Sequence, residues 1–316
     1  MRRSAELDNK TRVTDWKLSS LGDLQNKRYL ITGANSGIGY AAAEHLRRAN
    51  ADVFVAARSV TKGEEAVKNL MKIQGNGALH FIRLDLANME SIHNAVNAIR
   101  ELTDGLDGII NNAGIMAPPQ EQTADGFELQ FGTNHLGHFL LNYLTFDLIS
   151  KRSGRIVPVS SIAHRQSPGI NFDDPMFSKG YSPSKAYAQS KLANLMYGLE
   201  LARRLEAIGS GVKSVSAHPG YSATHLFTSS PTGVLRRVWR VTNRLALKPT
   251  VGSTSEVLAV AGTQAVNGAY YGPTQLGETR GPVGDCRISD VAKDLNAAKL
   301  LWNLSEDLLH IKWSIK

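Results

Sequence analysis

The sequence predicts an α/β fold: a single doubly wound parallel sheet with helices on both faces. Short apolar runs alternate with amphipathic stretches from residue 28 onward, which is the pattern of parallel strands joined by helices. The chain has 316 residues and is 42% hydrophobic, which is enough for one large α/β domain. No repeat, linker or second domain is apparent. We therefore expect residues 27–316 to form one domain, preceded by an arm of residues 1–26.

Six strands are expected from the buried apolar runs. They are RYLITG (28–33), DVFVAAR (52–58), LHFIRLDL (79–86), DGIINNAG (107–114), GRIVPVSS (154–161) and GVKSVSAHPG (211–220). Helices are expected through Ile38, Ala42 and Leu46, at 61–75 with a glycine at the end, and near 88–103, 123–151 and 183–208. Ligands of such sheets bind beyond the carboxyl ends of the strands, so the residues that follow each strand are the informative ones.

The composition excludes several classes of protein. No run of 18 apolar residues predicts a membrane-spanning helix, and the N-terminus lacks the apolar core of a signal peptide. Acidic residues in the N-terminal arm argue against a transit peptide; they are Glu6, Asp8, Asp15 and Asp23. The single cysteine, Cys286, rules out an internal disulfide and fits a reducing compartment. A soluble cytoplasmic protein is expected.

The net charge of +8 is unevenly distributed along the chain. Residues 221–248 contain no acidic residue and these basic ones: Arg236, Arg237, Arg240, Arg244 and Lys248. No nucleic-acid-binding motif accompanies them, so a nucleic-acid partner is not expected. A solvated helix face explains the segment, and contact with an anionic substrate, cofactor or membrane surface is the alternative.

A glycine-rich loop follows the first expected strand. It contains Gly33, Asn35, Ser36, Gly37, Ile38 and Gly39. Glycines allow a tight turn and close approach of the backbone to phosphates, and the helix that starts there directs free N–H groups at a pyrophosphate. Such a loop is a weak signal alone, but its position between the first strand and the first helix predicts a dinucleotide site.

The end of the second strand selects the dinucleotide. A carboxylate at this position would bind the ribose hydroxyls of NAD, whereas a basic residue accommodates the 2′-phosphate of NADP. Ala57 and Arg58 close the strand and Lys62 follows, with no carboxylate to repel a phosphate. NADP(H) is therefore the expected cofactor; the alternative is an arginine that only solvates a strand end.

The third and fourth strands end in residues suited to the rest of a dinucleotide. Asp85, followed by Leu86, offers a carboxylate that can accept a hydrogen bond from the adenine amino group. Asn112, Ala113 and Gly114 follow the fourth strand, where small residues let the chain pass beneath a flat ring. The asparagine can also hold neighbouring strands together by side-chain hydrogen bonds.

Two tyrosine–lysine pairs occur within residues 181–191, and local structure distinguishes them. Ser182 and Pro183 are typical of a helix start, so Tyr181 is expected to precede the helix, in a loop that could line the substrate entrance. Tyr187 and Lys191 lie inside the helix, one turn apart on one face. A neighbouring ammonium is expected to lower the phenol pKa from about 10 by roughly 1–3 units. Tyr187 is therefore the candidate general acid or base.

Further polar residues complete the candidate site. Ser160 and Ser161 end the fifth strand, where a hydroxyl can hold a substrate oxygen against the tyrosine. Asn134, on the long helix after the fourth strand, can interrupt a backbone hydrogen bond and hold a water that links the lysine to solvent. His135 and His138 lie nearby, but no third metal ligand is evident, so a structural role is expected for both.

These motifs together resemble the short-chain dehydrogenase/reductase superfamily. TGANSGIG, NNAG, Asn134, the serine after the fifth strand, YAQSK and HPGYSAT occur in the family's order over about residues 27–310. The resemblance implies a Rossmann fold and a catalytic tetrad of Asn134, Ser161, Tyr187 and Lys191. Pro219, Gly220 and Thr224 match the loop on the nicotinamide side of the cofactor, and about 221–248 match a small helical substrate lobe.

Longer stretches resemble one branch of the superfamily. AARSVTKGEEA, LQFGTNHLGHFLL, VSSIAH and YYGPTQLGETRG are similar to retinol-dehydrogenase-like proteins, which include the WW-domain oxidoreductases and generally prefer NADP. Membrane-bound members often carry an N-terminal apolar anchor, and none is seen here, so a retinoid is not the expected substrate. The resemblance implies hydride transfer between NADP(H) and a carbonyl or alcohol, lipophilic if residues 224–248 form an apolar lid.

Two alternatives to this function remain at this level. A nucleotide-binding regulatory or scaffold protein would not need all four tetrad residues, yet it would share the glycine loop. An epimerase or dehydratase on a sugar nucleotide would need a larger C-terminal part than the roughly 90 residues after the sixth strand. The family often forms dimers or tetramers, so a homo-oligomer is compatible with the resemblance.

Overall fold

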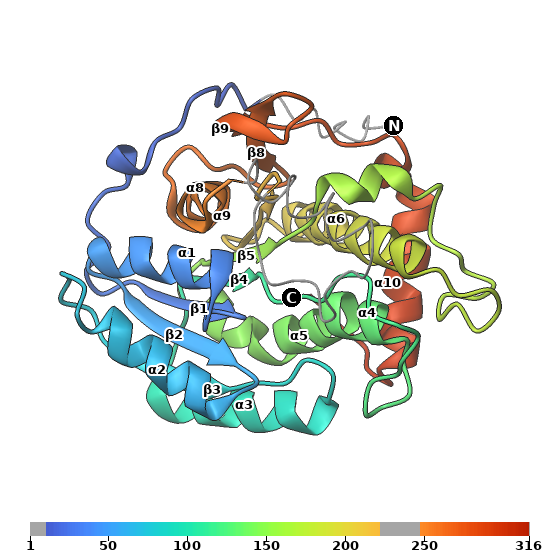
Figure 1. Cartoon of the computed structure of the whole chain (residues 1–316), viewed down its shortest axis with the longest axis horizontal. Helices are drawn as coiled ribbons and strands as arrows, with labels where there is room; N and C mark the ends of the chain where they lie inside the picture. The colour runs from blue at the N-terminus through green and yellow to red at the C-terminus, as the bar shows by residue number, and fades with distance from the viewer. Residues whose placement is uncertain (1–10, 222–246, 316) are drawn as a thin grey trace, which may run out of the picture.

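The computed structural model describes residues 11–221 and 247–315, and its centre is a six-stranded parallel sheet (Figure 1). The strands follow the order β3-β2-β1-β4-β5-β6. Their bounds are β1 (Arg28–Thr32), β2 (Asp52–Ala57), β3 (Leu79–Arg83), β4 (Gly108–Asn111), β5 (Arg155–Pro158) and β6 (Lys213–Ser214). All neighbours pair in parallel. The predicted doubly wound α/β sheet is confirmed, and its strand order reverses between β1 and β4, where ligands bind in such sheets.

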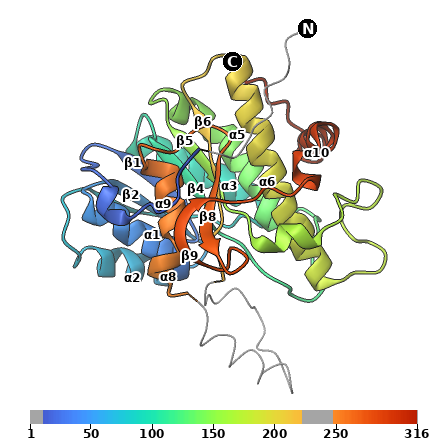
Figure 2. The same cartoon turned by 90° about the horizontal axis from the view of Figure 1, so that it is seen from above.

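Helices cover both faces of the sheet, as the alternating sequence pattern predicts (Figures 1 and 2). One face carries α1 (Gly37–Arg48), α2 (Val60–Leu70), α8 (Pro249–Gly252) and α9 (Thr254–Ala261). The opposite face carries α3 (Met89–Leu102), α5 (Gly137–Ser150) and α6 (Pro183–Ala207), and α10 (Leu295–Leu308) lies on the outside of α6. Short helical turns are η1 (Leu18–Ser20), η3 (Ile162–Gln166) and η4 (Val291–Lys293).

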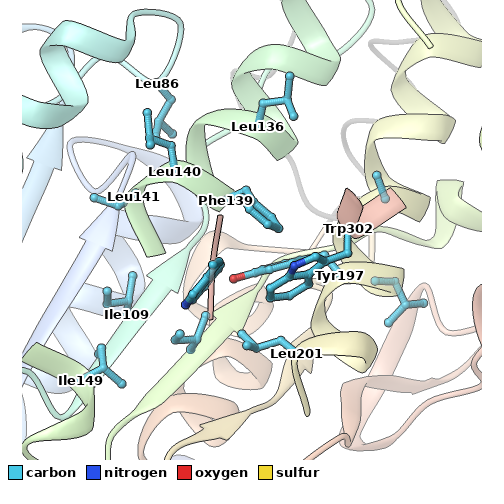
Figure 3. Close-up of a cluster of buried hydrophobic side chains, with 14 of the residues drawn as sticks. Leu86, Ile109, Leu136, Phe139, Leu140, Leu141, Ile149, Tyr197, Leu201 and Trp302 are labelled. Atoms are coloured by element: carbon cyan, nitrogen blue, oxygen red, sulfur yellow. The ribbon is translucent and has the colours of Figure 1, made fainter. Parts of the chain in front are cut away.

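An aromatic cluster joins α10 and the C-terminal segment to the helices beneath them (Figure 3). Trp302 is 2% exposed, and its ring centre lies 5.0 Å from that of Phe139 and 5.9 Å from that of Tyr197. Trp313 packs on Trp302 at 5.1 Å, and the guanidinium of Arg204 lies 4.1 Å from the Trp302 ring. Large aromatic surfaces and a cation over an indole ring therefore attach α10 to α5 and α6.

A second, three-stranded sheet was not predicted. It contains β7 (Ser216–Ala217), β8 (Tyr270–Gln275) and β9 (Arg280–Asp285). The expected strand 211–220 divides at Val215, because Ser214 pairs with β5 and Ser216 pairs with β8. The segments YYGPTQ and RGPVGD contain glycine and proline and lack an apolar alternation, which hides both strands from pattern analysis.

The described part of the N-terminal arm lies along this small sheet. The Trp16 backbone N–H donates to Val283 O at 2.8 Å, and the Asp285 backbone N–H donates to Val13 O at 2.8 Å. Trp16 is buried, and its indole N–H donates to Gln264 Oε1 at 3.1 Å. Residues 11–16 therefore act as a partner for β9.

The expected helix 123–151 starts later than predicted and has an irregular first part. Gly126 has φ +84°, a conformation that helices do not accommodate, so residues 123–128 form a turn. The helix begins with α4 (Leu129–Phe131), widens into the π-helical segment η2 (Gly132–Leu136) and continues as α5. The second expected helix also ends earlier, at Leu70 rather than Gly75.

The basic segment falls mostly outside the described residues. Residues 222–246 are not described; this range contains Thr224 and most of the expected substrate lobe. On either side of them, the Leu247 backbone N–H donates to Tyr221 O at 2.7 Å. None of the helices in the described ranges combines the length and apolarity needed to cross a bilayer.

Candidate active site

A cavity of about 360 Å³ lies beyond the carboxyl ends of the parallel strands. This volume falls in the range of small-molecule sites. Most of the residues singled out from the sequence line it: Gly33, Asn35, Ser36, Gly37, Ile38, Arg58, Asp85, Leu86, Asn112, Ala113, Gly114, Ser161, Tyr187, Lys191, Pro219 and Gly220. Tyr221, at the start of the expected substrate lobe, also lines the cavity. Sequence reasoning missed these further lining residues: Thr32, Ile115, Met116, Thr133 and Ile162.

The glycine loop forms one wall of this cavity. Gly33 and Gly37 have φ +67° and +60°, in the left-handed region that favours glycine. Ser36 is the N-cap of α1, yet its side chain does not bond the helix, and the first turn of α1 contains no acidic residue. The first N–H groups of α1 are thus left for an external acceptor, which fits the phosphates of a dinucleotide.

Gly39 does not line the cavity but permits the close packing behind it. A Cβ at this position would lie 2.4 Å from Asn112 Nδ2 and 2.8 Å from Gly33 O. Asn112 Nδ2 in turn donates to Thr32 O at 2.7 Å, which joins the ends of β1 and β4. The third glycine of the motif therefore lets α1 pack against the strand ends.

The adenosine end of a dinucleotide would meet Arg58 and Asp85. Arg58 is exposed at the end of β2, and Lys62 is exposed in the first turn of α2. Asp85 accepts from the Ala87 backbone N–H at 3.0 Å through Oδ1. Arg58 and Asp85 both line the cavity.

Tyr187 projects from α6 into the cavity and contacts Ser161. Tyr187 is 8% exposed, and burial raises its pKa to about 12, while a hydrogen bond with the Ser161 hydroxyl opposes the rise. The expected lowering by Lys191 is not found, because the cost of burying a phenolate outweighs other contributions. Tyr187 is therefore a protonated phenol at neutral pH.

The two adjacent serines have different roles in the structure. Ser160 is 1% exposed, and its hydroxyl donates to Lys191 O at 2.7 Å, which attaches the end of β5 to α6. Ser161 is the N-cap of η3, and its hydroxyl accepts from the Ala163 backbone N–H at 3.2 Å and opposes the rise of the Tyr187 pKa. Of the two, Ser161 is the hydroxyl beside the phenol.

Lys191 is buried below Tyr187. Its Nζ lies 5.9 Å from the centre of the Tyr187 ring and donates to Val159 O at 3.1 Å. Burial lowers the pKa of Lys191 to about 8, and the charge of Glu256 opposes the shift. Glu256, on α9, is fully buried and neither carboxylate oxygen has a hydrogen-bond partner in the described residues. Burial raises the pKa of Glu256 to about 8.

Asn134 lies behind the lining residues, in the π-helical segment η2. Its Oδ1 accepts from the Ile115 backbone N–H at 2.9 Å, and its Nδ2 donates to Ile115 O and to Ser190 Oγ. A Cβ added to Gly114 would lie 3.1 Å from Asn134 Oδ1 and 3.4 Å from Lys191 Nζ. Asn134 thus lies close to the ammonium, in a locally widened helix, as a break in the regular hydrogen bonding requires.

The two histidines beside Asn134 bind protein groups. The His138 ring lies between Asn134 O, 3.0 Å from Nδ1, and Thr32 Oγ1, 2.9 Å from Nε2. His135 Nε2 lies 2.9 Å from Ser305 Oγ on α10. Both rings are buried, and burial lowers the pKa of His135 to about 3 and of His138 to about 4, so both are neutral.

Tyr181 lies outside the cavity lining. Ser182 is the N-cap of α6 and Pro183 its first residue, so Tyr181 precedes the helix as predicted. Its hydroxyl meets Gln130 Nε2 at 3.0 Å and Pro118 O at 3.2 Å, and Lys185 is exposed. The first tyrosine–lysine pair is therefore not assembled.

The comparisons with known proteins agree with this geometry. The model of the short chain dehydrogenase family matches residues 27–234. Human "Retinol dehydrogenase 12" is 37% identical over 92% of this chain and 88% of its own length, and human "Retinol dehydrogenase 14" is 35% identical over 90% and 87%. The crystal structure of an uncharacterized protein from Mycobacterium Paratuberculosis superposes with a TM-score of 0.80 at 37% identity, covering 96% of this chain and all of that one. This chain belongs to the short chain dehydrogenase family, in its retinol-dehydrogenase-like branch, a family of oxidoreductases that bind a nicotinamide cofactor.

Proposed function

We propose that this oxidoreductase transfers a hydride between NADP(H) and a lipophilic carbonyl or alcohol. The observation that carries the proposal is that Tyr187, Ser161 and Lys191 line one cavity, with the Ser161 hydroxyl near enough to the phenol to oppose the rise of the Tyr187 pKa and with Lys191 one helical turn away. A phenol and a hydroxyl that meet at one point can bind one carbonyl oxygen together.

The cavity residues fit the proposed cofactor. The uncapped start of α1 would receive the pyrophosphate, Asp85 the adenine amino group, and Arg58 the 2′-phosphate that distinguishes NADP from NAD. Ala113 and Gly114 would pass beneath a flat ring, and Pro219 and Gly220 would border the nicotinamide. The preference for NADP rests on Arg58 and on the lack of a carboxylate at the end of β2.

The tetrad residues would manage the proton of the reaction. When bound, the reduced cofactor supplies the hydride to the carbonyl carbon. Tyr187 would donate its phenolic proton to the carbonyl oxygen, which Ser161 holds by a second hydrogen bond. The raised pKa of Tyr187, about 12, keeps the proton in place at neutral pH and favours the reducing direction.

Apolar lining residues support a lipophilic substrate. Ile115, Met116, Ile162 and Tyr221 are among the lining residues of the cavity. The similar proteins are named retinol dehydrogenases, and retinol is a lipophilic alcohol, which agrees with such a pocket. A cytoplasmic location and a homo-oligomeric state remain predictions of the sequence.

The test combines cofactor binding with turnover. NADPH and NADH binding would be measured, with NADPH consumption on a panel of lipophilic aldehydes and ketones, for wild type, Tyr187→Phe and the control Tyr181→Phe. Loss of turnover in Tyr187→Phe alone supports the proposal, since only that hydroxyl faces Ser161. Equal turnover in all three proteins contradicts the assignment of the acid. Tight NADPH binding without turnover on any compound would favour a non-catalytic regulatory protein.

A further inference from the structure

The turn between β8 and β9 carries a carboxylate that contacts two loops of the cavity. Glu278 lies in this turn with φ +67°, a left-handed conformation that is uncommon for residues other than glycine. Its side chain is 15% exposed. A charged residue in an unfavourable backbone conformation, pointing inward, indicates that its side-chain contacts are needed.

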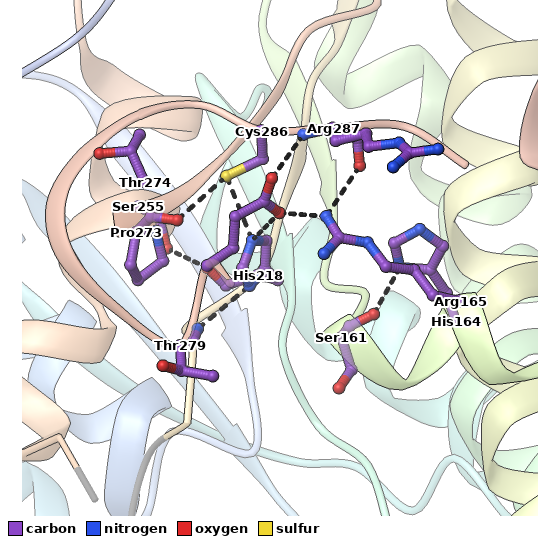
Figure 4. A network of polar contacts seen from close by, with 12 residues as sticks. Ser161, His164, Arg165, His218, Ser255, Pro273, Thr274, Thr279, Cys286 and Arg287 are labelled. Atoms are coloured by element: carbon purple, nitrogen blue, oxygen red, sulfur yellow. Dashed lines mark hydrogen bonds and ion pairs between the residues drawn. The ribbon is translucent and has the colours of Figure 1, made fainter. Parts of the chain in front are cut away.

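One contact of Glu278 reaches the loop of Ser161. Oε2 pairs with the guanidinium of Arg165, which is in η3, the helical turn that Ser161 begins. The Arg165 guanidinium also donates to Arg287 O at 3.2 Å, and the Arg287 backbone N–H donates to Glu278 Oε1 at 2.9 Å. Figure 4 shows Arg165, His164 and Ser161 on one side of this network. The ion pair thus anchors the turn that presents the Ser161 hydroxyl.

The other contact reaches the loop of Pro219 and Gly220. His218 Nε2 lies 3.6 Å from Glu278 Oε2 and 3.2 Å from Cys286 Sγ. The Gly220 backbone N–H donates to His218 Nδ1 at 3.2 Å. Nδ1 is therefore unprotonated, and the proton of the neutral ring lies on Nε2, facing the carboxylate and the sulfur. Next to Glu278, Thr279 O accepts from the Tyr221 backbone N–H at 2.9 Å.

Electrostatics favour the ionised state of Glu278 throughout the useful pH range. Burial alone would raise the pKa of its carboxyl group, but His218, the Arg287 N–H and the charge of Arg165 hold it at about 2. Burial lowers the pKa of His218, which favours the neutral ring that accepts the Gly220 N–H at Nδ1. The Glu278 carboxylate is therefore charged at neutral pH, as its pairing with Arg165 requires.

A metal site is the competing explanation of this cluster. The ligand atoms of His218, Glu278 and Cys286 lie within 4.8 Å of one another, and this is a set that zinc accepts. However, Arg165 pairs with the carboxylate and the Gly220 N–H occupies Nδ1, which leaves the ring proton on Nε2. A cation would have to displace that proton beside a guanidinium, so a hydrogen-bonded network fits the contacts better.

We propose that Glu278 is a positioning residue that fixes two cavity loops relative to each other. Through Arg165 it holds the Ser161 turn, and through His218 it holds the Pro219–Gly220 turn. The first turn presents the hydroxyl that binds the substrate oxygen, and the second borders the nicotinamide position. This inference rests on the proposed hydride transfer only for its catalytic consequence; the fixing of the loops is a property of the protein alone.

Hydrogen exchange of the protein alone tests the loops directly. In Glu278→Gln the amides of residues 159–166 and 216–221 should exchange faster, by about tenfold, because a charged hydrogen-bond partner of both loops is lost. Asp285→Asn is the matched control, since Asp285 lies on β9 and bonds Thr11 and Arg12 of the arm instead. Arg165→Gln should loosen only 159–166. Unchanged exchange in either loop of Glu278→Gln, or equal effects in the control, overturns the inference.

Ligand binding and turnover test the consequence. Glu278→Gln should weaken the binding of NADPH by about tenfold. The affinity for adenosine 2′,5′-bisphosphate should be unchanged, because that compound lacks the nicotinamide half. It should also lower kcat more than it raises KM. If the loops loosen but wild type reduces no carbonyl, the loop inference stands and the proposed function fails. One equivalent of zinc in the purified wild type, lost in Cys286→Ser, would overturn the inference in favour of a metal site.

Discussion

The ammonium of Lys191 lies 5.9 Å from the Tyr187 ring centre and donates its hydrogen bond to Val159 O, not to the phenol. The two groups therefore interact through space, across a buried region, while the Ser161 hydroxyl opposes the rise of the Tyr187 pKa that burial causes. Under the proposed function the two groups would have separate tasks: Ser161 would orient the phenol, and Lys191 would place a charge below it. The titration of each group follows from its burial.

We expect the titration of Lys191 to limit activity at high pH. Burial lowers its pKa to about 8, so the ammonium is lost as the pH rises through that value, whereas Tyr187 stays protonated until about 12. The kcat/KM for carbonyl reduction should be flat from about pH 6 to 7 and fall above about pH 8. Glu256→Gln should shift this fall to lower pH, because the charge of Glu256 raises the Lys191 pKa. A profile still flat at pH 9.5 contradicts the assignment.

Glu256 should cost the fold stability at alkaline pH. Burial raises the pKa of Glu256 from 4.5 to about 8. Its favourable contribution to the free energy of unfolding is therefore complete below about pH 4.5 and is lost as the pH rises to about 8. Glu256→Gln should therefore raise Tm at pH 8.5 by about 2–5 °C and leave it unchanged at pH 4.5. The control is Glu200→Gln, since Glu200 is buried but pairs with Arg203 and Arg204. That variant should lower Tm at pH 8.5, and the opposite order of the two variants would refute the argument.

Arg58 should determine the choice of cofactor. Arg58→Ala should weaken the binding of NADPH by about 10–100-fold, as expected for the loss of one charged hydrogen-bonding partner. The binding of NADH should be nearly unchanged. Arg83→Ala is the control, because Arg83 is also exposed at a strand end but does not line the cavity. Titration of both nucleotides by fluorescence measures the ratio. Equal losses for NADPH and NADH would show that Arg58 does not bind the 2′-phosphate.

Gly39 should tolerate no side chain. Gly39→Ala would place a Cβ 2.4 Å from Asn112 Nδ2 and 2.8 Å from Gly33 O, so the glycine loop must shift. We expect a loss of about 1–3 kcal/mol in unfolding free energy and at least a tenfold loss in NADPH affinity. Gly22→Ala, where a Cβ meets nothing within 4 Å, should behave as wild type. Urea unfolding and NADPH titration provide both values, and a wild-type Gly39→Ala protein is the result that excludes this role.

Trp302 should be essential for the attachment of α10. Trp302→Ala removes contacts with Phe139, Tyr197 and the Arg204 guanidinium (Figure 3), and should cost about 3–5 kcal/mol of unfolding free energy. Leu300→Ala is the control on the same helix, because Leu300 is 53% exposed. Denaturant unfolding compares the two variants. Similar losses in both would mean that the aromatic cluster does not hold the helix.

Some features of the site follow from local sequence. The apolar runs determined the parallel sheet, because buried strands and amphipathic helices each leave a short-range pattern. The choice of Tyr187 over Tyr181 was available in the same way: Ser182 and Pro183 start α6, and only residues beyond them share a helix face. The tight turn of the glycine loop was recognisable from Gly33 and Gly37, because the left-handed backbone of such a turn favours glycine.

Other features depend on contacts between distant parts of the chain. Glu278 pairs with Arg165, which lies 113 residues away in the sequence. β8 pairs with β7 through its backbone, and the sequence of β8 has no apolar alternation that would reveal the pairing. In the sequence, Glu256 is recognisable only as a carboxylate within the apolar run of α9. Nothing in that run indicates that Glu256 and Lys191 affect each other's charge. The sequence alone determined which residue types follow each strand; only the tertiary structure decided how deeply Tyr187 and Lys191 are buried. Burial sets their pKa values because desolvation of a charge depends on everything packed around it.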